Sequence, residues 1–315
     1  MNNKSTILIT GGTGLIGTAL SKLLIANKHD VIILSRKIPE QKAVNDPAIQ
    51  YAKWNIREQM IDEEAIKKAD HIVHLAGASV AEKRWTSSRK KEIIESRILS
   101  SELLVKALKE IPNNVLSVIS SSAIGWYGGD SRAKTPFMED DPAAEGFLGE
   151  TCKAWEESIE PVRKLGKRLV KLRTGIVLSN RGGALYEFKK PLNLGVASIL
   201  GNGKQVMSWI HIDDICRMYS YAIENQQLHG VYNAVAPHPA TNKELVLQLA
   251  KKMRGNFFVP IYVPAFVLKM VLGEMSIEVL KSATVSNQKI RQAGFRYLYP
   301  SLEASIEHLS KELKV

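Results

Sequence analysis

The chain has 315 residues, 45% of them hydrophobic, and a formal net charge of +11. Its two cysteines, Cys152 and Cys216, are far apart and outside any C-x-x-C pattern, so the sequence implies no disulfide framework or zinc site. Its Lys and Arg residues are scattered and form no nucleic-acid motif, so we expect the charge to serve an anionic cofactor rather than a nucleic acid. No apolar run is long enough to span a bilayer, and the first strand begins too early for a signal peptide; we expect a cytoplasmic protein with no membrane partner.

The first predicted elements are a strand over residues 5–10 and a helix over residues 14–27, joined by glycines. A G-x-x-G-x-x-G pattern between a strand and a helix is typical of a dinucleotide-binding loop. Gly11 permits a tight turn, Gly14 lets a pyrophosphate approach, and Gly17 lets the helix pack closely. The residues predicted to contact the cofactor here are Gly11, Thr13, Gly14, Leu15, Ile16 and Gly17.

The next strand, predicted over residues 30–35, ends at Ser35, Arg36 and Lys37. Proteins that bind NAD usually have an acidic residue at this place for the ribose 2′-hydroxyl, whereas proteins that bind NADP place an arginine nearby for the 2′-phosphate. The acid is absent, and Arg36 can make a forked bond to phosphate. The alternative is a solvated basic strand end. We predict that NADP(H) is the cofactor and that these three residues contact it.

Strand and helix patterns continue to alternate through the first half of the chain. Further strands are expected near residues 48–54, 70–76, 115–121 and 168–173, and helices near 86–110 and 147–165. This alternation predicts an α/β protein with a Rossmann-type, doubly wound parallel sheet.

The pattern changes after about residue 178. A Gly-containing stretch runs from 182 to 203, a strand-like segment follows at 206–211, and the remainder carries short helical patterns. We predict an NADP-binding Rossmann domain over residues 1–178, to which a segment near 205–235 returns. Residues 179–204 and 237–315 would form a smaller α+β substrate lobe.

Four segments make the chain similar to extended or atypical short-chain dehydrogenases/reductases of the NAD-dependent epimerase/dehydratase superfamily. They are Thr10–Gly17, matching T-G-G-x-G-x-x-G; His74–Gly77; Ser120–Gly128, resembling S-S-S-x-x-Y-G with one extra residue; and Trp209–Asp214. The C-terminal part resembles a subgroup called epimerase family proteins, which end in a domain of unknown function. The resemblance implies that Leu75, Ala76, Gly77 and Ser120 lie at the cofactor.

The chain departs from this superfamily at its catalytic pair, Tyr-x-x-x-Lys. In the superfamily that tyrosine exchanges a proton with the substrate while the nicotinamide exchanges hydride, and a serine holds the substrate oxygen. Ser122 matches the serine, but no tyrosine lies on the predicted helix over residues 147–165. Lys153 is either a displaced remnant of the lysine or helix surface. Tyr186 begins a Y-x-x-x-K match in the wrong element, where it is either a replacement acid or a chance match.

Other polar residues are candidates for ligand contacts. Glu92 and Arg97 lie on the predicted helix over residues 86–110, and Arg97 could bond a cofactor phosphate or ribose, or the substrate; the alternative is a solvated helix face. Arg173 and Thr174 end the sixth strand, at the edge where open α/β sheets bind ligands, although Arg173 could instead be a structural ion-pair partner.

No metal site is expected. His211 and Asp213 have the residue types of a metal pair, but Asp213 and Asp214 more simply cap a helix over residues 213–225. Cys152 is expected to be a buried apolar side chain rather than a nucleophile.

Two functional hypotheses follow. The first is an NADP(H)-dependent oxidoreductase or epimerase that acts on a small polar substrate with a rearranged acid/base set. The second is a non-catalytic NADP(H)-binding sensor or interaction module. The resemblance also implies a homodimer through the helices predicted over residues 86–110 and 147–165.

Overall fold

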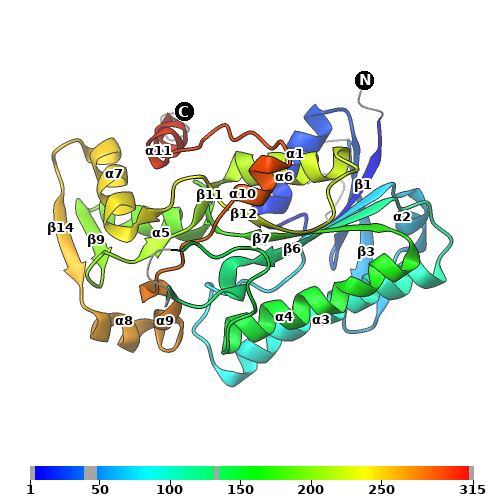
Figure 1. Ribbon diagram of the computed structural model, residues 1–315, viewed down its shortest axis with the longest axis horizontal. Coiled ribbons are helices and arrows are strands. Elements are labelled where there is room, and N and C mark those ends of the chain that lie inside the picture. Colours follow the sequence, from blue (N-terminus) through cyan, green and yellow to red (C-terminus); the bar gives the residue numbers. More distant parts are fainter. Residues whose placement is uncertain (1–3, 39–47, 131–134, 312–315) are drawn as a thin grey trace.

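The computed structural model describes residues 4–38, 48–130 and 135–311, and these form a central sheet of eight strands with helices on both faces (Figure 1). The spatial order of the strands is β12-β7-β6-β5-β1-β2-β3-β4. The strands are β1 (Thr6–Thr10), β2 (Asp30–Ser35), β3 (Ile49–Asn55), β4 (Met60–Ile61), β5 (His71–His74), β6 (Ser117–Ala123), β7 (Arg168–Thr174) and β12 (Gly230–Ala234). All neighbours are parallel except β3 and β4.

Helices cover the sheet in two layers. On one face lie α1 (Leu15–Ala26) and α6 (Ile212–Glu224), and on the other lie α3 (Ser87–Glu110) and α4 (Phe147–Ile159), as Figure 1 shows. Short helices complete this part: α2 (Glu63–Lys68) and the 3₁₀ helices η2 (Ile124–Trp126) and η3 (Glu160–Leu165).

The strands alternate between two cores because successive strand side chains point to opposite faces of a sheet. In β1, Ile7 and Ile9 pack in the core on the α1 and α6 side, and Leu8 packs in the other. In β2, Ile33 packs in the core on the α1 and α6 side, and Ile32 packs in the other core. The near-continuous apolar strand sequences follow from burial on both faces.

The strand order reverses between β1 and β5. From β1 the chain proceeds through β2 and β3 to one edge, and it later proceeds from β5 through β6 and β7 to the other. In open α/β sheets ligands bind outside the carboxyl ends of the strands at such a reversal. The strand order therefore favours a ligand site where β1 and β5 end.

The remaining elements build a second region, beside the β12 edge of the sheet. Three small strand pairs occur in it: β8 (Ile176–Leu178) with β11 (Trp209–His211), β9 (Val196–Leu200) with β14 (Val259–Val263), and β10 (Val206–Met207) with β13 (Ala240–Thr241). Its helices are α5 (Gly183–Leu192), α7 (Asn242–Arg254), α8 (Ala265–Leu272), α9 (Met275–Leu280), α10 (Gln288–Gln292) and α11 (Leu302–Lys311).

The α/β, Rossmann-type expectation is confirmed, with differences in detail. The helix expected over residues 147–165 divides into α4 and η3, because Pro161 has no N–H with which to continue an α-helix. The Gly-containing stretch 182–203, in which no helix or strand was predicted, contains α5 and β9. Residues 312–315 of the predicted substrate lobe lie outside the described part. No described helix is long and apolar enough to cross a membrane.

Candidate cofactor and active site

The glycine loop between β1 and α1 has a geometry that only glycine permits. Gly11 has a φ of +67°, and a Cβ placed on it would lie 2.9 Å from the carbonyl carbon of Leu75. A Cβ on Gly17 would lie 2.4 Å from the carbonyl oxygen of Gly11. Gly11 is therefore required for its backbone conformation, and Gly17 for the close approach of α1 to the loop.

The first turn of α1 is open to a ligand. Gly14 is its N-cap, and a Cβ there would have only the Gly11 carbonyl oxygen, at 3.2 Å, within 4 Å. No described side chain caps this turn, which contains no acidic residue. Thr13 is exposed, and Leu15 and Ile16 are half-buried. The N–H groups and the positive end of the helix dipole thus fit the pyrophosphate of a dinucleotide.

A buried hydrogen-bond chain joins the ends of β1 and β5 beneath this loop. The Thr10 hydroxyl accepts the N–H groups of Leu75 and Ala76 at 3.1 and 3.2 Å, and it lies 2.8 Å from Nδ1 of His74. The hydroxyl therefore donates to Nδ1, and Nε2 of His74 donates to Ser101 at 3.2 Å. Burial lowers the pKa of His74 to about 3, so its ring is neutral.

The end of β2 presents two cations. Ser35 accepts the N–H of Lys37 at 3.4 Å and donates to its carbonyl oxygen at 2.7 Å, which forms a turn. Arg36 and Lys37 are exposed, and no described residue is hydrogen-bonded or ion-paired to the Arg36 guanidinium. A free guanidinium at this strand end fits a ribose 2′-phosphate.

Arg97, on α3, is a largely enclosed cation. Its Nη1 donates to the carbonyl oxygens of Ala78 and Ile93 at 3.0 and 2.8 Å, and its guanidinium lies 4.9 Å from the Trp155 ring centroid. Burial lowers the pKa of Arg97 to about 10, which still leaves it charged at neutral pH. No carboxylate in the described part of the chain pairs with it, and its Cζ would lie 3.1 Å from a Cβ on Gly77. An unpaired cation beside the end of β5 fits an anionic ligand.

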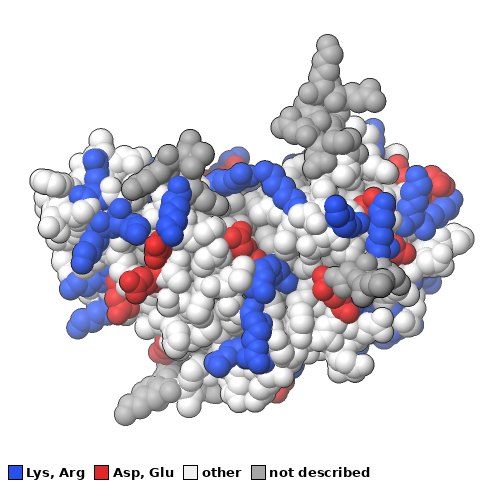
Figure 2. All heavy atoms as spheres, turned by 90° about the horizontal axis from the view of Figure 1, so that it is seen from above, with Lys and Arg blue, Asp and Glu red and all other residues white. Residues whose placement is uncertain are grey.

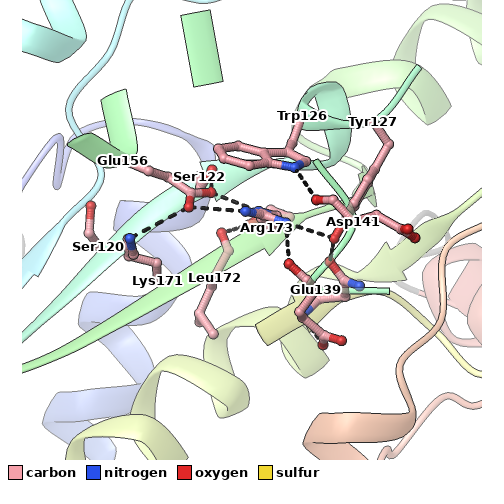
Figure 3. A network of polar contacts seen from close by, with 12 residues as sticks. Ser120, Ser122, Trp126, Tyr127, Glu139, Asp141, Glu156, Lys171, Leu172 and Arg173 are labelled. Carbon is pink, nitrogen blue, oxygen red and sulfur yellow. Dashed lines mark hydrogen bonds and ion pairs between the residues drawn. The ribbon is translucent and has the colours of Figure 1, made fainter. Parts of the chain in front are cut away.

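Ser122 belongs to a closed, buried cluster with Glu156 and Arg173 (Figure 3). Its hydroxyl donates to Oε1 of Glu156 at 2.7 Å. Arg173 binds the same carboxylate through Nε at 2.8 Å and Nη2 at 3.2 Å. Lys171 lies 3.6 Å from the second oxygen. The proton of Ser122 is thus engaged inside the protein, and the ion-pair alternative for Arg173 is the one that the geometry supports.

The other side of the Arg173 guanidinium is also occupied. Its Nη1 donates to the Tyr127 hydroxyl at 2.9 Å and to the Glu139 carbonyl oxygen at 3.0 Å, and its Cζ lies 3.7 Å from the Trp126 ring centroid. Tyr127 in turn donates to Asn233 at 2.8 Å. Burial raises the pKa of Tyr127 to about 12. This tyrosine is therefore a structural group rather than an acid poised for proton transfer.

Three more candidates for cofactor contacts have partners within the protein. Ser120 is buried in β6 and donates to the Ser121 carbonyl oxygen at 3.1 Å, and Thr174 donates to that of Leu172 at 3.3 Å. Glu92 lies exposed on α3 and pairs with Arg89 at 2.7 Å. Their contacts with a cofactor remain predictions.

The usual catalytic pair has no counterpart on α4. The residue four before Lys153 is Gly149, and a Cβ there would lie 2.0 Å from the Ala144 carbonyl oxygen. The backbone has therefore closed over the position at which Tyr-x-x-x-Lys spacing would place a tyrosine. Lys153 is exposed and lines a surface cavity of about 290 Å³, which Glu156 and Lys171 also border and which does not include the glycine loop.

Two further side chains from the sequence analysis differ in exposure. Tyr186 is 45% exposed on α5, where its ring lies 5.1 Å from Nζ of Lys190. Cys152 is buried, and burial raises its pKa to about 12, as expected for an apolar side chain rather than a nucleophile.

The N-cap of α6 differs from the one that the sequence predicted. His211, rather than Asp213 and Asp214, is the N-cap: its Nδ1 accepts the Asp213 N–H at 3.0 Å. Its Nε2 then carries the proton and faces Nδ1 of His308 at 3.3 Å. The His211, Asp213 and His308 ligand atoms lie within 4.8 Å of one another, but both nitrogens of the buried His211 ring are used in hydrogen bonds. The group is thus a hydrogen-bonded helix cap.

Sequence reasoning missed Glu156, the residue on which Ser122 and Arg173 converge. Its only signal is that Arg173, at a buried strand end, requires a carboxylate partner, and α4 offers several acids of which one faces inward.

The fold and the glycine loop are those of a Rossmann-type dinucleotide-binding protein. Residues 7–149 match the model of the NAD dependent epimerase/dehydratase family, and residues 263–309 match a domain of unknown function, DUF1731. The epimerase family protein ML0860 of Mycobacterium leprae is 31% identical over 98% of this chain and 96% of its own length. The epimerase family protein YfhF of Bacillus subtilis is 33% identical over 98% of this chain and 99% of its own length.

Two solved structures are also similar to this chain. A crystal structure of the human epimerase family protein SDR39U1 with NADPH has a TM-score of 0.83 and 29% identity over 97% of this chain and 99% of its own. The UDP-N-acetylglucosamine 4-epimerase of Bacillus cereus has a TM-score of 0.77 and 18% identity over 99% of this chain and 100% of its own. At this identity the similarity shows the fold alone. The chain belongs to the NAD dependent epimerase/dehydratase family, among the proteins called epimerase family proteins. The predicted family and subgroup are confirmed.

Proposed function

We propose that the protein binds NADP(H) and is an oxidoreductase or epimerase that acts on a small polar substrate with a non-standard acid/base set. The observation that carries the proposal is Arg36, an exposed guanidinium that no described residue pairs with, at the end of β2 beside an open glycine loop. Arginine at this place favours the 2′-phosphate of NADP over the 2′-hydroxyl of NAD. The similarity to human SDR39U1, solved with NADPH, supports the same choice.

The surroundings of Arg97 support the binding of an anionic group near the end of β5. A guanidinium enclosed without a carboxylate is costly unless an anion completes its environment. Arg97 lies beside Gly77, which follows the end of β5 near the reversal of strand order, and open α/β sheets bind ligands at such a reversal. We infer that Arg97 binds a cofactor phosphate or ribose, or a charged substrate. When bound, the nicotinamide supplies or accepts hydride.

A specific observation favours a second candidate function, a non-catalytic NADP(H) sensor. Gly149 stands four residues before Lys153, where a Cβ would clash with the Ala144 carbonyl oxygen, and the Ser122 proton is engaged by Glu156. Neither change disturbs the glycine loop. A protein that kept the cofactor site and lost the acid/base pair would have this combination.

The cofactor assignment is tested by calorimetric titration of the full chain with NADPH and with NADH. Arg36→Ala should weaken NADPH binding about tenfold to a hundredfold, because a charge-assisted bond is lost, and should leave NADH binding nearly unchanged. Lys109→Ala, which removes an exposed cation at the end of α3, is the matched control. Equal losses for both cofactors would contradict the 2′-phosphate assignment.

Native mass spectrometry of the gently purified protein separates the two functions. The enzyme hypothesis expects NADP(H) together with a second small molecule, into which deuterium from 4-deuterated NADPH is transferred. The sensor hypothesis expects NADP(H) alone and no transfer. Retained NAD(H), or a protein that ignores NADPH, would contradict both.

We also propose a homodimer through α3 and α4, which lie together on one face of the sheet (Figure 1). Light scattering on a sizing column tests this: Glu102→Arg on the exposed side of α3 should convert a dimer to a monomer, whereas a monomeric wild type would contradict the proposal.

A further inference from the structure

The end of the molecule formed by β14 exposes many apolar side chains. Leu194 is 84% exposed, Phe257 88% and Val259 62%. Phe266 and Met270 on α8 are each 68% exposed. We call these five residues the β14 surface. Single exposed apolar residues are ordinary, but a concentration on one set of elements marks an interaction site.

These residues belong to adjoining elements. The loops that carry Leu194 and Phe257 are joined, because Val259 N–H donates to the Gly195 carbonyl oxygen at 2.8 Å and Arg254 Nε donates to that of Leu192 at 2.9 Å. From this end β14 runs alongside β9 directly to α8. Figure 1 shows β14 as the left-hand end of the molecule, with α7 above it and α8 below.

The segment that carries four of the five residues of the β14 surface is basic. Residues 251–273 contain four cations, Lys251, Lys252, Arg254 and Lys269, and no Asp or Glu. All four cations are exposed. Figure 2 shows this left-hand end with many Lys and Arg side chains beside uncoloured ones, and with a smaller group of Asp and Glu side chains. A partner that covers the apolar residues therefore meets a positive border.

Strand pairing with a second copy is disfavoured. Val259 directs its N–H toward β9, so the next residue, Pro260, occupies the position from which β14 would offer an N–H to a further strand. Proline has no N–H, and it is typical of edge strands that do not pair. A symmetric contact between two β14 surfaces would also bring the positive border of one copy against that of the other.

We propose that the β14 surface docks the protein on an anionic lipid membrane, with Phe257 and Leu194 inserted at the headgroup level and the four cations against lipid phosphates. Apolar side chains that stand out from loop ends enter fluid lipid without needing a matching pocket, and cations near them strengthen binding to anionic lipids. This proposal differs from the sequence expectation of no membrane partner, and it assigns a role to the start of the DUF1731 region. It is independent of the proposed enzymatic function.

The test is sedimentation of the full chain with vesicles of phosphatidylcholine alone or mixed equally with phosphatidylglycerol. We expect binding only to the mixed vesicles, and binding that weakens as salt rises. The double variant Phe257→Ser, Phe266→Ser should lower the partition coefficient about tenfold or more. The matched control Leu116→Ser, Leu298→Ser removes apolar side chains that are 62% and 55% exposed elsewhere, and it should bind as wild type does.

Three results would overturn the proposal. They are no binding to the mixed vesicles, equal binding to phosphatidylcholine alone, and unchanged binding of the double variant. A dimer that the double variant dissociates in light scattering would assign the surface to a second copy instead. NADPH affinity should be the same in all these variants, so failure of this proposal and failure of the cofactor proposal are distinguishable.

Discussion

The carboxyl edge of the sheet ends in two different kinds of structure. Where β1 and β2 end, the first turn of α1 has no side-chain cap and Arg36 has no partner in the described part of the chain. Where β6 and β7 end, Ser122, Glu156 and Arg173 satisfy one another in a buried cluster. The first region leaves polar groups for a ligand, whereas the second uses them internally.

This difference indicates which half of the site contributes to the stability of the folded protein. Removing a group from the closed cluster leaves a buried charge without a partner, so folding suffers. Changes at the open positions, Gly14 and Arg36, leave the folded protein nearly intact, so only ligand binding suffers. The following variants test this division.

The largest effect is expected for Glu156→Ala. Loss of the carboxylate leaves Arg173, 2% exposed, as an uncompensated buried cation, which should lower the free energy of unfolding by about 3–5 kcal/mol. Urea unfolding measures this change. Glu157→Ala, at an exposed neighbour on the same helix, should stay within about 0.5 kcal/mol. A Glu156→Ala protein as stable as the control would show that the cluster is not closed in solution.

A smaller effect concerns His74, which lies beneath the open loop. Its pKa is about 3 in the folded protein and 6.5 without burial, so below pH 6.5 the unfolded chain binds more protons. The stability that neutral His74 contributes is therefore full above pH 6.5 and is lost as pH falls toward 3. At about pH 5 the loss is about 2 kcal/mol.

Urea unfolding of wild type and His74→Asn at about pH 7.5 and about pH 5 isolates this contribution. The loss of stability between the two pH values should be smaller in the variant. His238→Asn, at an exposed histidine, should keep the wild-type difference. An unchanged pH dependence in His74→Asn would show that the ring is not buried neutral between β1 and β5.

The smallest effect on folding is expected for Gly14→Ala. The added methyl group has only one protein atom nearby, so stability should change by less than about 1 kcal/mol. The methyl group lies where the pyrophosphate would approach, so NADPH affinity should fall about tenfold or more in calorimetry. Gly129→Ala, with ordinary contacts, is the control for both measurements. Retained affinity would mean that the dinucleotide does not lie on this turn.

The cofactor half of this architecture was accessible from sequence because its signals are local. A strand, three glycines and a helix follow one another within residues 5–27, and each glycine answers to a short-range backbone requirement. The same holds for Arg36, one residue after β2. The alternation of strands and helices likewise predicted the parallel sheet.

The closed cluster was not accessible because its members lie far apart in the chain. Ser122, Glu156 and Arg173 come from β6, α4 and β7, and only the register of the sheet and the rotation of α4 bring them together. Helix α5 was missed for a different reason. Gly183 begins it and Pro191 lies inside it, so its composition is that of a loop, and tertiary packing of Leu185 and Leu192 decides its structure.

The pairing of β12 with β7 has a consequence for synthesis of the chain on the ribosome. The edge strand Gly230–Ala234 joins the sheet only after the whole of α5, β9 and α6 has emerged. Until then β7 has an unpaired edge, and an unpaired edge invites association with other chains. A nascent chain stalled before residue 230 should therefore depend on chaperones, and a protein cut at residue 178 should aggregate rather than fold as an autonomous cofactor-binding fragment.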